Sequence, residues 1–119
     1  MNEPHPLETL RETPLTDGQQ QRLFGLIDTL LQDAITARAP KNRPPGKAGL
    51  RAEKGYYRLL YLADDFRQHV GQPSATDDGD TSYHWSHLDT IIAQLADIPE
   101  LQAEILAGIA SSLARVAGS

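Results

Sequence analysis

Large apolar residues recur at helical spacing in four segments of the chain, and the clearest of these is residues 99–117. Its large apolar positions are Leu101, Ile105, Leu106, Ile109, Leu113 and Val116. Residues three or four apart lie on one face of a helix, so this segment predicts an amphipathic helix. Small residues form an adjoining stripe, and only a narrow polar arc remains. We therefore expect this helix to be covered on two sides and to be the central element of the fold.

Two longer segments upstream also predict helices. The first begins at Thr16, which forms a capping-box pattern with Gln19, and it must end before Pro40. The second runs from about Leu50 to Val70. Its expected buried positions are Ala52, Tyr56, Leu59, Leu60, Ala63, Phe66 and Val70.

A fourth helix is expected from Asp80 or Thr81 to about Ile98. Asp97 and Glu100 have the spacing of a second capping box, so this helix should join the last one with almost no loop. No segment shows the apolar–polar alternation of a strand. The pattern predicts an all-α protein, a small bundle of four main helices: residues 16–119 as a single helical domain after a flexible N-terminal arm, residues 1–15.

Composition indicates the cellular compartment of the protein rather than its fold. The 119 residues include no cysteine, which excludes disulfides and thiol catalysis and fits a reducing compartment. The N-terminus lacks the pattern of a secretory signal, and no apolar segment reaches the ~20 residues of a membrane span. A cytoplasmic location is the simplest expectation.

Charge is concentrated in one segment. The net charge is −5, yet residues 38–58 hold seven of the eleven Lys and Arg residues against the single acid Glu53. Part of this segment, residues 39–49, is a proline-rich linker. The candidate contact residues are Arg43, Lys47, Arg51, Lys54 and Arg58. They suit a solvated linker and helix face, a contact with an acidic partner or with the chain's own acidic face, or binding to nucleic acid.

Little in the sequence points to catalysis or metal binding. His84 and His87 could share a metal, but zinc needs a third ligand, so no metal and no cofactor are expected. No nucleophile–base pair or phosphate-binding loop stands out, and we do not expect an enzyme. Residues 92–101 resemble a helix-turn-helix, but Asp97 replaces the usual turn glycine and the second helix begins with acidic and apolar groups. DNA reading there is not expected.

Aromatic and small residues offer two candidate interaction surfaces. Tyr and Trp are frequent at interface hot spots, and the candidates for partner binding are Tyr57, Tyr61, Tyr83 and Trp85. Trp85 could equally anchor the core. A second candidate is the stripe of small residues in the last helix, which would let two copies of this helix pack closely in a homodimer. It comprises Ala103, Ala107, Ala110, Ala114 and Ala117. The alternative is that another helix of the same chain covers these alanines.

These patterns favour a non-catalytic regulatory or adaptor protein. It would act by binding a partner protein, such as a transcription regulator or an enzyme, with sequestration or inhibition as its mode of action. The alternative is a nucleic-acid-associated accessory protein that uses the basic segment 38–58.

Overall fold

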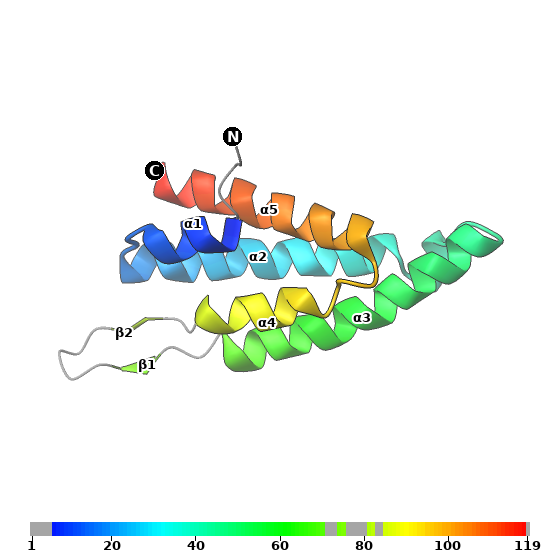
Figure 1. Cartoon of the computed structure of the whole chain (residues 1–119), viewed down its shortest axis with the longest axis horizontal. Coiled ribbons are helices and arrows are strands. Elements are labelled where there is room, and N and C mark those ends of the chain that lie inside the picture. Colours follow the sequence, from blue (N-terminus) through cyan, green and yellow to red (C-terminus); the bar gives the residue numbers. More distant parts are fainter. Residues whose placement is uncertain (1–5, 71–73, 76–80, 83–84, 119) are drawn as a thin grey trace.

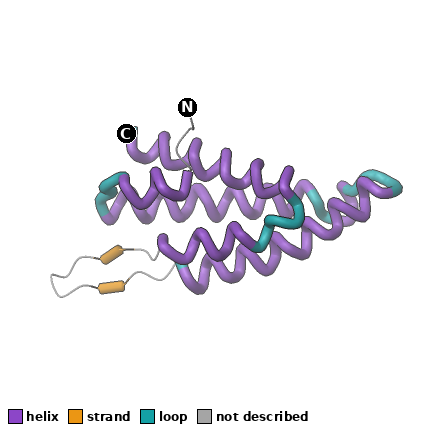
Figure 2. Tube along the Cα trace, in the orientation of Figure 1, coloured by secondary structure: helices purple, strands orange, loops and turns teal. Residues whose placement is uncertain are grey.

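The computed structural model describes residues 6–70, 74–75, 81–82 and 85–118 (Figure 1). The α-helices are α1 (Pro6–Glu12), α2 (Asp17–Ala37), α3 (Lys47–His69), α4 (Leu88–Ala93) and α5 (Pro99–Ala117). Short 3-10 helices, η1 (Pro40–Asn42) and η2 (Trp85–His87), precede α3 and α4. An antiparallel pair of two-residue strands, β1 (Ser74–Ala75) and β2 (Thr81–Ser82), lies between α3 and η2. The fold is all-α, as predicted, apart from this small pair (Figure 2).

The central helix of the bundle is α2, not α5 as expected. Helix α2 packs against α3 on one side and α5 on the other, α1 lies against α5, and α4 lies along α3 (Figure 1). The large apolar face of α5 is buried, but Ala103, Ala107 and Ala114 on its adjoining face are exposed. The described helices therefore cover the alanine face only at Ala110, which is half-buried, and coverage by a second copy stays a prediction.

The start of α2 follows the sequence prediction, and the start of α5 does not. At α2, the Thr16 hydroxyl accepts a hydrogen bond from the Gln19 backbone N–H at 3.2 Å, and the Gln19 side chain accepts one from the Thr16 N–H at 2.9 Å. At α5, the N-cap is Ile98, which makes no side-chain cap hydrogen bond. The predicted capping box of Asp97 and Glu100 is absent because both carboxylates bind basic side chains of α3 instead.

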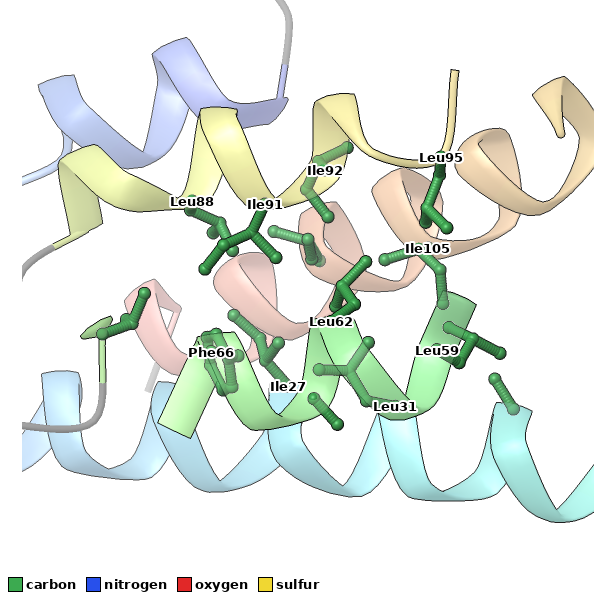
Figure 3. Close-up of a cluster of buried hydrophobic side chains, with 14 of the residues drawn as sticks. Ile27, Leu31, Leu59, Leu62, Phe66, Leu88, Ile91, Ile92, Leu95 and Ile105 are labelled. Atoms are coloured by element: carbon green, nitrogen blue, oxygen red, sulfur yellow. The ribbon is translucent and has the colours of Figure 1, made fainter. Parts of the chain in front are cut away.

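The core is a continuous apolar layer between α2, α3, α4 and α5 (Figure 3). Its largest side chains with almost no exposure are Leu23, Ile27, Leu31, Leu59, Leu62, Phe66, Leu88, Leu95, Leu101, Ile105 and Ile109. The ring of Phe66 stacks on Phe24 of α2 with centroids 4.7 Å apart. On α3, Leu60 is exposed, so its predicted burial was wrong, and Leu62, which was not among the expected buried positions, is buried. Helix α3 contacts α2 and α4, and its buried arc follows Leu59, Leu62 and Phe66.

Two other helix boundaries differ between the sequence prediction and the structure. Residues 6–12 of the expected flexible arm form α1, and Leu7 and Leu10 are each only 4% exposed. The arm docks there because these two leucines join the common core. The helix expected to begin near residue 80 is shorter: η2 and α4 cover residues 85–93, and turns follow to Ile98.

Candidate protein-interaction surface

The outer face of α3 carries large apolar side chains that the fold leaves exposed. Leu50 is 68%, Tyr57 52%, Leu60 39% and Tyr61 71% exposed. We call these four residues the α3 surface. Tyr57 and Tyr61 were predicted to belong to a binding surface, and the helix places them one turn apart on the same side. Leu50 and Leu60 were not predicted to belong to this surface. Leu60 was expected in the core. Leu50 was predictable, because it lies seven residues, or two helical turns, before Tyr57.

Beside this surface, the basic residues of α3 are paired with acids of the same chain. Arg51 forms two hydrogen bonds with Glu100. Lys54 Nζ lies 3.1 Å and Arg58 Nη2 2.9 Å from Asp97 Oδ2. For these three residues, the structure thus shows one of the predicted roles of the basic segment, which is contact with the chain's own acidic face.

These ion pairs shift the pKa values of the acids. Hydrogen bonding from Arg51, together with a backbone hydrogen bond, lowers the pKa of Glu100 to about 2. The hydrogen bond from Lys54, followed by the charge of Arg58, lowers the pKa of Asp97. Both carboxylates stay ionised at neutral pH, so they compensate the positive charge of the first half of α3.

The linker before α3 is held by arginine side chains. Arg43 Nε donates a hydrogen bond to the Arg38 carbonyl at 3.0 Å, and its guanidinium lies 5.1 Å from the centre of the Tyr56 ring. Arg38 in turn pairs with Glu104 at 3.1 Å. Lys47, at the start of α3, is exposed. Of the five candidate basic residues, the structure therefore uses Arg43 to fold the linker and leaves Lys47 on the surface.

Trp85 lies apart from the α3 surface. Its side chain is half-buried against the core, and its Nε1–H donates a hydrogen bond to Gln20 Oε1 of α2 at 3.2 Å. Tyr83 lies outside the described residues. The structure therefore separates Trp85 from Tyr57 and Tyr61, and Trp85 has the anchoring position that the sequence left open as its alternative.

A histidine pair that the sequence did not predict lies between α3 and η2. The rings of His69 and His87 have centroids 5.7 Å apart and line a depression of about 190 Å³ together with Asp65 and Gln94. His84, the other histidine of the pair considered and rejected as a metal site in the sequence, lies outside the described residues. Within the described ranges, no three His, Cys, Asp or Glu side chains are grouped so that they could hold a metal ion.

A second depression, of about 200 Å³, lies between the end of α2, the first half of α3 and the start of α5. Arg38, Arg51 and Glu100 form its polar rim, and Gly55 and Leu101 are part of its apolar wall. A Cβ on Gly55 would lie 3.2 Å from both the Arg38 and Leu101 side chains, so the glycine lets Arg38 cross α3. The charged groups on the rim of this depression are already paired: Arg51 with Glu100, and Arg38 with Glu104. The depression therefore serves the packing of these helices.

The alanine face of α5 is accessible. Ala103, Ala107, Ala114 and Ala117 are exposed, and Ala110 is half-buried. The helices of the described chain therefore leave four of these alanines uncovered. A homodimer through this face stays a prediction of the sequence.

Comparisons of the chain with protein-family models, curated proteins and solved structures find no match. Among the helices of the described residues, none is both long enough and apolar enough to cross a membrane. Function must therefore be inferred from the chain's own surfaces, and within the described residues the α3 surface holds the large apolar side chains that are exposed.

Proposed function

We propose that this chain is a non-catalytic regulatory or adaptor protein that binds a partner protein through the α3 surface. One observation carries the proposal: four large apolar side chains, two of them tyrosines, are exposed on one side of a single helix. Tyr buries a large area on binding with little loss of conformational entropy, which is why it is frequent at interface hot spots.

The setting of the α3 surface supports a protein as its ligand. Helix α3 is rigidly mounted, because Leu59, Leu62 and Phe66 on its other side are fully buried. A rigid helix with exposed apolar side chains at intervals of three, four and seven residues suits the recognition of another helix. The cysteine-free sequence fits action in the cytoplasm. Sequestering a transcription regulator or inhibiting an enzyme would each require no more than such a surface.

Site-specific photo-cross-linking tests the proposal. A photoreactive phenylalanine analogue at Tyr57 or Tyr61 should cross-link one defined protein in cells, and the same analogue at Thr29 on exposed α2 surface should not. The identified protein is then purified, and its affinity for the chain is measured by calorimetry. We expect Tyr61→Ala to weaken this binding by about 10- to 100-fold. Equal labelling from all three positions, or unchanged affinity in the variant, would refute the role of the α3 surface.

A further inference from the structure

The exposed side of α3 has the spacing of a coiled-coil seam. Six positions follow one another at alternating intervals of four and three residues, and all six are exposed. They are Leu50, Lys54, Tyr57, Tyr61, Asp64 and Gln68. This is the spacing of the two inward positions of a heptad, at which side chains of one helix insert between those of another.

The seam is complementary to itself when one helix is reversed. About a midpoint at Leu59, reversal brings Tyr57 opposite Tyr61 of the second copy and Lys54 opposite its Asp64. Lys54 and Arg58 share the single acid Asp97 of their own chain, so this group keeps one net positive charge toward that Asp64. The aromatic pairs then form the two central layers, and opposite charges form the layers on either side. A parallel arrangement would instead place Lys54 beside Lys54 and Asp64 beside Asp64, which opposes association.

We propose that this seam, which includes Leu50, Tyr57 and Tyr61 of the α3 surface, binds the same seam of a second copy, so that the free protein is an antiparallel homodimer. The inference rests on the proposed function, because it concerns regulation of the same surface: a partner protein must displace the second copy. The N-terminal part of α3 extends beyond α4 and α5 (Figure 1), and all six seam positions along the helix are exposed.

The dimer should be weak and reversible. The seam from Leu50 to Gln68 spans only ~27 Å at the rise of an α-helix. Its central contacts are two tyrosine pairs, and its ion pairs are solvent-exposed and contribute little. A contact of this size falls at the small end of protein interfaces, where dissociation constants are on the order of 10–100 µM.

Sedimentation velocity over a concentration series tests the association. We expect a monomer–dimer equilibrium in the wild type, a dissociation constant at least about 10-fold higher for Tyr57→Ala/Tyr61→Ala, and no change for the control Asp33→Lys on exposed α2 surface. A chain that stays monomeric up to ~1 mM overturns the inference. So does a dimer that Ala110→Glu disrupts and the tyrosine substitutions do not, which would place the interface at the alanines of α5.

Two charge variants test the self-complementarity. Lys54→Glu alone would place acid opposite acid, and Asp64→Lys alone would place base opposite base, so each should weaken its own dimer by about 3- to 10-fold. An equimolar mixture should restore association, because both charge pairs become complementary in the mixed dimer. No recovery in the mixture overturns the proposed register.

Cross-linking determines the direction of the two helices. Since the chain has no cysteine, Lys54→Cys and Asp64→Cys introduce single thiols. A disulfide needs Cα atoms within about 7 Å, so the antiparallel register allows one only between the two different variants. A disulfide in the mixture supports the inference, and a disulfide in either variant alone overturns it. If the wild type is monomeric and the photo-cross-link to a partner persists, this inference fails while the proposed function stands.

Discussion

Arg51 of α3 binds Glu100 in the first turn of α5 through both carboxylate oxygens, with Nη2 2.7 Å from Oε2. This contact joins the projecting half of α3 to the helix that follows α4 in sequence. Its geometry is the two-pronged pairing of a planar guanidinium with a carboxylate. Both side chains are 55% exposed, so the pair aligns α3 and α5 more than it stabilises them.

Acid should weaken this alignment. The pKa of Glu100 is lowered to about 2 in the folded chain, from an ordinary value of 4.5. Because this pKa is lower in the folded chain, ionised Glu100 stabilises the folded state, and its full contribution is present at pH values above the unfolded pKa. The contribution is lost as the pH falls from about 4.5 towards 2. We expect Glu100→Gln to reduce the loss of thermal stability between these pH values, as measured by circular dichroism. The control Glu12→Gln on α1 should unfold with the acid sensitivity of the wild type; equal curves for both variants would contradict the prediction.

Two aromatic residues of α3 should respond differently to substitution by alanine. Phe66 is fully buried and stacked on Phe24, so Phe66→Ala should lower the free energy of unfolding by about 3–5 kcal/mol. Tyr61 is 71% exposed, so Tyr61→Ala should change it by no more than about 0.5 kcal/mol. Urea unfolding followed by circular dichroism measures both. A large loss in the Tyr61 variant would show that this ring is covered within the monomer.

The approach of α2 to α5 depends on Gly108. A Cβ at this position would lie 2.5 Å from Leu30 Cδ2, so the larger side chain of Gly108→Val must displace Leu30. We expect a loss of about 1–3 kcal/mol in unfolding free energy. A Cβ at Gly25, in the middle of α2, would meet no atom within 4 Å, and Gly25→Ala should therefore stabilise the helix by about 0.5–1 kcal/mol. Thermal melts that rank the two variants in the opposite order would be incompatible with this packing.

Binding to nucleic acid should be weak. Arg51, Lys54 and Arg58 are paired with Glu100 and Asp97, so much of the positive charge of α3 is compensated within the chain. We expect fluorescence anisotropy to detect only weak, non-specific binding to DNA or RNA at physiological salt.

The matched variant replaces Arg43, Lys47, Arg51 and Lys54 with alanine, and it should flatten any dependence of that binding on salt concentration. Tight binding by the wild type at physiological salt would favour the alternative function, a nucleic-acid-associated accessory protein.

Several local features were predictable from the sequence. The Thr16–Gln19 capping box is confirmed because its two partners lie three residues apart, so no distant contact is needed to form it. Pro99 likewise begins α5, as its ring and missing N–H favour the first turn of a helix. Asp97 and Glu100 fit the same local capping pattern, but α3 offered them cationic partners from residues about 40 to 50 positions away in the chain.

The sequence by itself determined that the chain is all-α, which segments form the long helices and which face of each is apolar, because helical periodicity and capping are local properties. Only the tertiary structure decided which apolar positions became core and which became surface. Leu60 and Leu62 are both leucines of one helix, and the places taken by α2 and α4 bury Leu62 and expose Leu60. Burial depends on neighbours distant in sequence, and the α3 surface is the part of the apolar pattern that the packing of the other helices left uncovered.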